Sequence, residues 1–363
     1  MDAVPPQISA RLARSRDLFH RLPANARLLL IRLKSMGDCL LLTSPVRALK
    51  AEFPSFRVSI LVDHRFADVF EGNPDIDEII RIRGKGGTIG RLLTRSFDAI
   101  VNLHGGPTSL LYARCARGLR IGGEHFQHAW LYGGSFPRPN PAIHTVASTL
   151  EVFRWLGVRA DTPPPLRYDA HPDAAARVNA RLADAVAAGR SLPIGDREPP
   201  STPRYVVVHP ASVMATKRWP ADRFAALVTW MQQAGLGVVL TCGPGEEALV
   251  AEIQQRAQGA LALPGLSIPE LAELIRGARC YIGNDSGPMH LATAVGTPTV
   301  AIWGSSSSVR WHPWGVEQRV VQNPFACNPC PGYRCLVASS PLCIESVTVA
   351  QVQTAVQELL HRR

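Results

Sequence analysis

Short apolar runs alternate with stretches of helical spacing through the first half of the chain. Residues 28–31 form a continuous apolar run, typical of a strand buried on both faces of a parallel sheet, and residues 40–53 have helical spacing. Strands that alternate with helices in this way predict a doubly wound parallel sheet. The other elements predicted here are strands at 58–62, 79–81 and 97–103, with helices at 65–71 and ending near residue 95.

The same alternation returns in the second half, after a break. Residues 171–188 have the composition of an Ala-rich helix, whereas residues 190–203 contain four prolines and no periodicity, which indicates a linker. Beyond it, the sequence predicts strands at 205–208, 237–241, 280–282 and 299–302, and a C-terminal helix at 347–361.

These patterns predict an α/β protein with two Rossmann-like doubly wound domains that face a central cleft. The predicted bounds are 27–189 for the first domain, 190–203 for the linker, 204–346 for the second domain and 347–363 for the C-terminal helix.

The first 26 residues, 1–26, precede the first predicted domain. Within 8–22, Ile8, Leu12 and Phe19 recur at helical intervals with arginines between them, which predicts a basic amphipathic helix. Such a helix can rest on an acidic membrane surface or pack on its own domain, and the second role is the more common one.

Composition and charge narrow the class of protein. With 363 residues, 46% apolar and 19% charged, the chain resembles ordinary globular proteins of two domains. No apolar run is long enough to span a bilayer and no secretory signal pattern opens the chain, so a cytoplasmic enzyme is expected. The formal net charge of +10 favours an anionic partner, although no basic-aromatic module supports nucleic acid. The oligomeric state stays open.

The richest chemistry follows predicted strands, where doubly wound sheets bind their ligands. Residues 283–294 combine a strand end, a turn with Gly287 and a helix whose first turn suits Pro288. Free amides of such a turn bind phosphate, and a nucleotide diphosphate is the expected ligand. The alternative is that Asp285 and Ser286 only cap a structural helix.

The segment after the first predicted strand carries Asp38, close to Lys34 and Ser35. A carboxylate at this point can act as a general base toward a hydroxyl group, with Lys34 and Ser35 as candidates for the acceptor side. Its alternative role is to cap the helix that follows.

Two further segments complete the predicted nucleotide site. Within 209–219, Lys217 offers a positive charge to a leaving diphosphate and Ser212 offers a hydrogen-bond donor. Within 241–247, Glu246 suits the ribose hydroxyls of a nucleotide. The chain has neither a G-x-G-x-x-G after its first strand nor a G-x-x-x-x-G-K-[ST], which argues against a nicotinamide dehydrogenase and a P-loop NTPase.

Four of the eight cysteines crowd together, namely Cys327, Cys330, Cys335 and Cys343. Four thiolates can hold zinc, but this spacing lacks the paired knuckles of a zinc ribbon. A thiol-rich ordered loop is therefore favoured over a metal site or a disulfide, and no metal is expected.

Four ordered motifs resemble glycosyltransferase family 9, the ADP-heptose:lipopolysaccharide heptosyltransferases. The resemblance runs from about residue 27 to the C terminus. The motifs lie at 31–45, at 71–77, at 209–220 with its Lys-Arg-Trp-Pro, and at 284–290, which has the sequence Asn-Asp-Ser-Gly-Pro-Met-His.

The resemblance implies a GT-B fold and a metal-independent, inverting transfer of heptose from ADP-heptose to the lipopolysaccharide inner core. The lipid A-core acceptor would be met at the inner membrane surface. Asp38 would be the general base, Lys217 a diphosphate ligand, and Glu246, or its neighbour Glu247, the ribose ligand. The other positions carried over to donor binding are Asp285, Ser286, Gly287, Met289 and His290.

One loop departs from the family pattern. Residues 305–308 are four serines where many relatives have Thr-Asp-Pro, so the donor contacts of this loop stay open. The alternatives are a related transferase with another nucleotide sugar or acceptor, and a non-catalytic protein that binds a nucleotide sugar.

Overall fold

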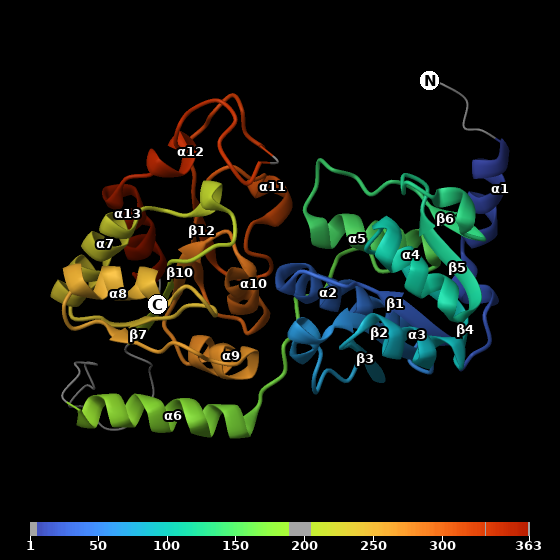
Figure 1. Ribbon diagram of the computed structural model, residues 1–363, viewed down its shortest axis with the longest axis horizontal. Coiled ribbons are helices and arrows are strands. Elements are labelled where there is room, and N and C mark those ends of the chain that lie inside the picture. Colours follow the sequence, from blue (N-terminus) through green and yellow to red (C-terminus); the bar gives the residue numbers. More distant parts are fainter. Residues whose placement is uncertain (1–5, 189–204, 331, 362–363) are drawn as a thin grey trace. The chain divides into compact units, whose positions relative to one another are not determined.

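The short apolar runs form the central strands of two parallel sheets, one in each of two units. The computed structural model describes residues 6–188, 205–330 and 332–361 (Figure 1). Unit 1 is Met1–Arg167 and unit 2 is Tyr168–Arg363. The predicted linker at 190–203 lies outside the described residues.

In unit 1 the described strands form a six-stranded parallel sheet in the order β3-β2-β1-β4-β5-β6. Residues 28–31 of its central strand have no exposed surface, as expected for a strand covered on both faces. The strands are β1 (Arg27–Ile31), β2 (Arg57–Asp63), β3 (Glu78–Ile82), β4 (Ser96–Asn102), β5 (Arg117–Gly123) and β6 (Gly134–Phe136). The helices are α1 (Pro6–Ser15), α2 (Met36–Glu52), α3 (Lys85–Leu93), α4 (Gly106–Cys115) and α5 (Thr145–Leu156).

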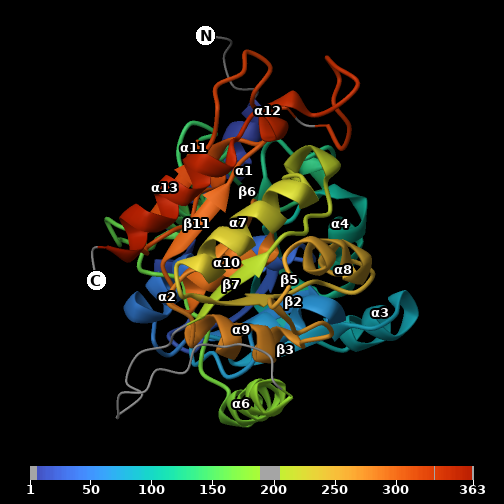
Figure 2. The same cartoon turned by 90° about the vertical axis from the view of Figure 1, so that its left-hand side faces the viewer.

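In unit 2 the described strands form a second six-stranded parallel sheet, in the order β12-β11-β10-β7-β8-β9. Figure 2 shows α13 beside α7. The strands are β7 (Tyr205–His209), β8 (Gly237–Leu240), β9 (Leu261–Ala262), β10 (Tyr281–Asn284), β11 (Thr299–Ile302) and β12 (Gln318–Val321). The helices are α6 (Pro172–Ala187), α7 (Ala221–Gln233), α8 (Glu247–Arg256), α9 (Ile268–Arg276), α10 (Gly287–Ala294), α11 (Ser308–Trp311), α12 (Leu342–Glu345) and α13 (Val349–Leu360).

The two sheets share one topology. In each, the chain starts in the middle, adds two strands on one side, and then crosses over to add three on the other. The strand order therefore reverses between β1 and β4 in unit 1 and between β7 and β10 in unit 2. Doubly wound sheets bind ligands outside the carboxyl ends of the strands at such a switch point. The topology thus singles out one place in each unit.

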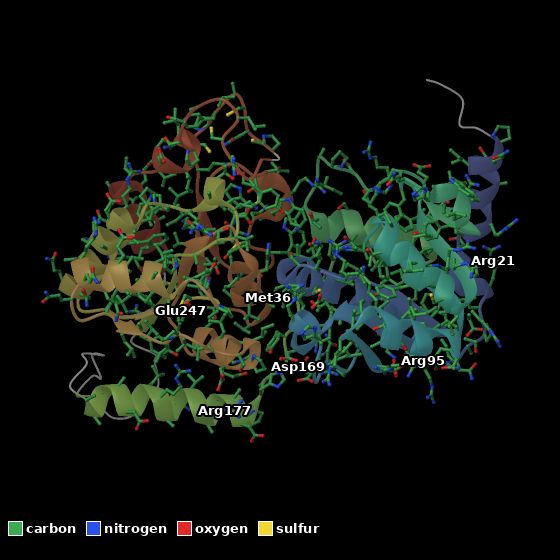
Figure 3. All side chains as sticks on the ribbon, viewed as in Figure 1. Arg21, Met36, Arg95, Asp169, Arg177 and Glu247 are labelled. Atoms are coloured by element: carbon green, nitrogen blue, oxygen red, sulfur yellow. The ribbon has the colours of Figure 1, made fainter. Side chains whose placement is uncertain are left out.

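Helix α6 belongs to unit 2, whereas the sequence grouped it with the first domain. Figure 3 shows Arg177 on α6. Arg177 donates to Glu270 at 2.8 Å, and Arg181 donates to the carbonyl of Pro264 at 2.8 Å. These contacts with α9 and the segment before it place the boundary between the units ahead of α6.

The N-terminal segment packs on unit 1. Helix α1 ends at Ser15, earlier than predicted, because Asp17 adopts a left-handed conformation (φ 50°) before a short 3-10 helix, Leu18–Arg21. Phe19 is 1% exposed and meets the rings of Phe53 and Phe153 edge-on. The packing interpretation is therefore confirmed for Phe19. No helix in the described parts of the chain is both long and apolar enough to cross a membrane.

Candidate functional site

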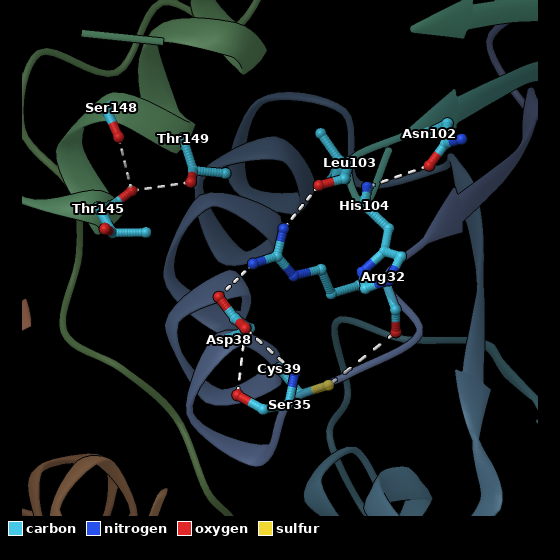
Figure 4. Close-up of polar contacts among 10 residues, drawn as sticks. All are labelled: Arg32, Ser35, Asp38, Cys39, Asn102, Leu103, His104, Thr145, Ser148 and Thr149. Atoms are coloured by element: carbon cyan, nitrogen blue, oxygen red, sulfur yellow. Dashed lines mark hydrogen bonds and ion pairs between the residues drawn. The ribbon is translucent and has the colours of Figure 1, made fainter. Parts of the chain in front are cut away.

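The switch point of unit 1 carries Asp38 in the first turn of α2 (Figure 4). Its Oδ2 accepts hydrogen bonds from the Ser35 backbone N–H at 3.0 Å and the Ser35 hydroxyl at 3.1 Å, which completes a capping box. Its Oδ1 pairs with the guanidinium of Arg32. Asp38 therefore does cap α2, as the alternative held, but it also forms an ion pair that capping does not require.

Arg32 connects the ends of the two central strands of unit 1. Its second terminal nitrogen donates to the carbonyl of Leu103, just beyond β4, at 2.6 Å (Figure 4). Leu103 in turn donates its backbone N–H to Ile31 of β1 at 3.1 Å. The guanidinium, and with it the Asp38 carboxylate, is held at the point where the strand order reverses.

The Asp38 carboxylate stays ionised at neutral pH. Burial alone would raise its pKa, but the charge of Arg32 and the hydrogen bonds from Ser35 and Arg32 outweigh burial and hold the pKa below its usual value. About a fifth of the side chain, 21%, remains exposed. An ionised carboxylate with accessible surface can accept a proton.

His104 is a member of this site that the sequence reasoning missed. It follows β4, and its backbone N–H donates to Asn102 Oδ1 at 3.0 Å. Burial, with the charges of Arg32 and Lys34, lowers its pKa to about 4, so the imidazole is neutral at pH 7. The strand predicted at 97–103 ends immediately before His104. Its position directly after a strand was therefore the signal that could have identified His104 as a site residue. Lys34 and Ser35, in the segment between β1 and α2, are both exposed.

The switch point of unit 2 is built around Asp285, at the end of β10. This residue is 5% exposed, and its Oδ2 lies 2.6 Å from Nζ of Lys217. The Ser306 hydroxyl also donates to Oδ2, and the Ser212 hydroxyl donates to the Asp285 carbonyl at 3.3 Å. Two segments that the sequence singled out, 209–219 and 283–294, thus meet at Asp285, together with a third segment. Ser306 comes from the serine loop whose contacts the sequence left open.

Helix α10 begins at this carboxylate. Its N-cap residue is Ser286, whose side chain makes no capping hydrogen bond, and Pro288 lies in the first turn. The Asp285 carboxylate pairs with Lys217 instead of the helix amides. Ser286 thus holds the N-cap position, but its side chain does not occupy the first-turn amides. Amides of this kind, that of Gly287 among them, are a site at which an anion can bind.

Two further predicted positions lie on α10. The side chain of Met289 has no exposed surface, and that of His290 is 4% exposed. Met289 is therefore closed to a ligand in this conformation, and its contact with the donor stays a prediction.

The segment that carries Lys217 is firmly anchored. Trp219 donates its backbone N–H to Asn284 Oδ1 at 3.2 Å and its indole N–H to the carbonyl of Val347 at 2.8 Å. Asn284 also donates to the carbonyl of Pro210 at 2.7 Å. Arg218 donates to the Ser212 carbonyl and so braces its own loop. These contacts fix the position of Lys217 relative to α10.

Glu246 and Glu247 differ in their surroundings. Glu246 Oε2 accepts from the Gly243 N–H at 2.8 Å and lies 3.9 Å from Nε2 of His209, at the end of β7. Burial lowers the pKa of His209 to about 4, so that imidazole is neutral and the contact is not an ion pair at pH 7. Glu247 is exposed at the start of α8 and accepts from the Gly245 N–H at 3.2 Å (Figure 3). Glu246 is the one beside a central strand.

The cysteine-rich segment is attached to the same region of unit 2. Cys330 donates its backbone N–H to the Ser305 carbonyl at 2.7 Å, and the Thr216 hydroxyl donates to the Gly332 carbonyl at 3.0 Å. Its four cysteines line a cavity of about 160 Å³, and burial raises the pKa of the Cys343 thiol. All are free thiols, and no group of three or more His, Cys, Asp or Glu among the described residues is arranged to hold a metal ion.

Known proteins of similar sequence and structure agree with this architecture. The chain is 30% identical to lipopolysaccharide heptosyltransferase 3 of Escherichia coli strain K12 over 303 residues, 77% of this chain and 82% of that protein. A glycosyl transferase family 9 structure from Veillonella parvula superposes with a TM-score of 0.79 at 21% identity, covering 94% of this chain and 99% of the other. The E. coli heptosyltransferase WaaC with ADP gives 0.70 at 20% identity, covering 92% and 99%.

These structural matches confirm the GT-B fold, and the similar sequences confirm the glycosyltransferase class. The model of the family described as glycosyltransferase family 9 (heptosyltransferase) matches residues 88–339. The chain therefore belongs to glycosyltransferase family 9.

Proposed function

We propose that this protein transfers heptose from ADP-heptose to the inner core of lipopolysaccharide, with inversion at the anomeric carbon. The observation that carries the proposal is the Lys217–Asp285 pair beside the uncapped start of α10. Support comes from the E. coli relative named as a lipopolysaccharide heptosyltransferase and from the similar WaaC structure with ADP.

The donor diphosphate would bind to the first-turn amides of α10 and to Lys217. The Asp285 carboxylate, 2.6 Å from Nζ of Lys217, holds the ammonium group beside the first turn of α10. Hydrogen bonds from Ser306 and Ser212 hold Asp285 in turn. Glu246, tethered to the Gly243 amide, would accept the ribose hydroxyls. Donor recognition would thus fall to unit 2.

Asp38 would act as the general base. The acceptor hydroxyl loses its proton to the carboxylate as its oxygen bonds to the anomeric carbon, and the bond from that carbon to the diphosphate breaks. Because Arg32 and Ser35 hold the pKa of Asp38 low, the transfer completes only once the attacking hydroxyl has become acidic in the transition state. Lys34 and Ser35 would contact the acceptor.

The negative charge that develops on the departing ADP would be stabilised by groups already in place. An ammonium ion and oriented amides act on such charge without reorganisation. We therefore propose that no metal ion is needed, and undiminished turnover in the presence of a chelator is the expected result.

The proposed function is tested by mixing the purified protein with ADP-heptose and a panel of truncated lipopolysaccharide cores, and then weighing the products. One core should gain a single heptosyl unit. Transfer only from a different nucleotide sugar would replace the donor. Binding of ADP-heptose without transfer to any core would point to a non-catalytic protein.

A further inference from the structure

One loop of unit 2 exposes apolar side chains that its own fold does not cover. In the segment between β12 and α12, Tyr333 is 68% exposed, Leu336 72% and Val337 70%, and Leu342 at the start of α12 is 50% exposed. We call these four side chains the apolar tip. Figures 1 and 2 both show the segment projecting beyond the helices of unit 2.

The charge of this segment is one-sided. Residues 324–344 contain no Asp or Glu, and Arg334 is their one basic residue. The whole chain has a formal net charge of +10. An aromatic ring, aliphatic side chains and an arginine, without carboxylates, suit the boundary between anionic headgroups and acyl chains. The next carboxylate in sequence, that of Glu345 in α12, is half-buried and already accepts a hydrogen bond from the Ser340 hydroxyl at 2.7 Å.

The base of the loop is fixed to the donor-binding region. Cys330 is hydrogen-bonded to Ser305, and Gly332 to Thr216, at 2.7 and 3.0 Å respectively. Asn328 donates to the Gly304 carbonyl at 3.0 Å. Thr216 and Ser305 directly adjoin Lys217 and Ser306 in sequence. An interaction at the apolar tip would therefore orient the donor site as well.

We propose that the apolar tip inserts into the headgroup region of an anionic membrane and so holds unit 2 at the surface that carries the acceptor. The inference rests on the proposed function only in taking that acceptor to be linked to lipid. It assigns the membrane contact to Tyr333, Leu336, Val337 and Leu342, in place of the N-terminal helix.

Flotation of the full-length protein with vesicles tests this. Wild-type protein should float with vesicles of phosphatidylethanolamine and phosphatidylglycerol, and less with phosphatidylcholine alone. The double variant L336D/V337D would bring two carboxylates into the headgroup region. Its partition coefficient between vesicles and water should therefore be lower than that of the wild type by roughly tenfold or more. The matched control, Leu93→Asp, places a carboxylate at a 54% exposed apolar position of α3 in unit 1 and should float like wild type.

Transfer assays separate this inference from the proposed function. L336D/V337D should keep wild-type turnover on a delipidated, water-soluble core and lose most turnover on the same core embedded in vesicles. If no core is glycosylated but flotation is still lost in the double variant, the membrane contact stands and the acceptor assignment fails.

Three results would overturn the membrane contact. The first is that the wild-type protein does not float with vesicles, and the second is that the wild type and the double variant float equally. The third is that a substitution in the apolar tip abolishes self-association, measured by light scattering, while vesicle binding persists. The last would assign the apolar tip to a second copy of the chain.

Discussion

Helices α2 and α10 both begin at the switch point of a doubly wound sheet, α2 after the first strand of unit 1 (β1) and α10 after the fourth strand of unit 2 (β10), yet they use their acidic residues in opposite ways. At α2, Asp38 caps the helix and leaves part of its carboxylate exposed. At α10, the Asp285 carboxylate is buried against Lys217, and Ser286 provides no side-chain cap. We infer that the first arrangement presents a base, whereas the second leaves amides and an ammonium ion for an anion.

Helix α9 shows what the α2 arrangement looks like away from a switch point. Ser267 and Glu270 form a capping box there, and Arg177 pairs with Glu270 as Arg32 does with Asp38. The hydrogen bonds from Ser267 and Arg177 lower the pKa of Glu270 to about 2. A capping box with an arginine is therefore a structural feature by itself. We infer a chemical role for Asp38 only from its place at the switch point, where Arg32 also binds the residue after β4.

Asp38→Asn should have the largest effect, a fall in turnover of roughly a hundredfold to a thousandfold, because the amide cannot accept the proton. Glu270→Gln makes the same change in the matched capping box and should leave turnover at the wild-type level. Steady-state kinetics on both variants, with melting temperatures as a check of folding, decide the matter. Equal turnover in the two variants would reduce Asp38 to a cap.

Lys217→Ala should weaken ADP binding by roughly tenfold to a hundredfold, since a charged contact to the diphosphate is lost. The control is Lys50→Ala, which breaks another Lys–Asp pair, that with Asp77 at 3.2 Å in unit 1. Isothermal titration should show that Lys50→Ala binds ADP with wild-type affinity. Unaltered affinity in Lys217→Ala would remove the lysine from the donor site.

Acid should destabilise unit 2 through His209. The pKa of His209 is about 4 in the folded protein, whereas the ordinary value for histidine, expected in the unfolded chain, is 6.5. As the pH drops, the unfolded chain therefore binds this proton before the folded protein does, and stability falls below about pH 6.5. Between pH 7 and pH 5 the loss should be about 2 kcal/mol. Urea unfolding at stepped pH should show that stability depends less steeply on pH in His209→Asn than in the wild type, and an equal dependence in the two proteins would contradict this assignment.

Ser306→Ala should have the smallest effect, a rise of a few-fold in the KM for ADP-heptose, because Asp285 keeps Lys217 and loses only one neutral donor. Ser308→Ala is its control, since that hydroxyl donates to Gln322 at 2.7 Å instead. A larger effect in Ser308→Ala than in Ser306→Ala would show that the serine loop acts through its overall shape.

The sequence predicted the buried central strands well, because continuous apolar runs such as 28–31 leave few alternatives. It missed β12 (Gln318–Val321), a partly exposed edge strand without an apolar run, and β5 (Arg117–Gly123), which is rich in glycine and arginine. The β-propensity of their residues predicts such strands poorly, because they are stabilised by hydrogen bonds to the neighbouring strand.

The site residues divide in the same way. Asp38, Lys217 and Asp285 could be predicted because they lie in motifs directly after central strands. His104 directly follows the predicted strand at 97–103 and was overlooked. Ser306 was missed because its contact with Asp285 joins two segments that are distant in sequence. The pKa of Asp38 likewise depends on Arg32 and Ser35 being held together by β1, β4 and α2, which no local pattern specifies.

The central claim is that proton transfer and donor binding are served by different units, and ADP titration of Asp38→Asn tests it most directly. The account predicts that this variant binds ADP with wild-type affinity while its turnover is almost abolished. Loss of ADP affinity in Asp38→Asn comparable to that in Lys217→Ala, in a variant that remains folded, would contradict it.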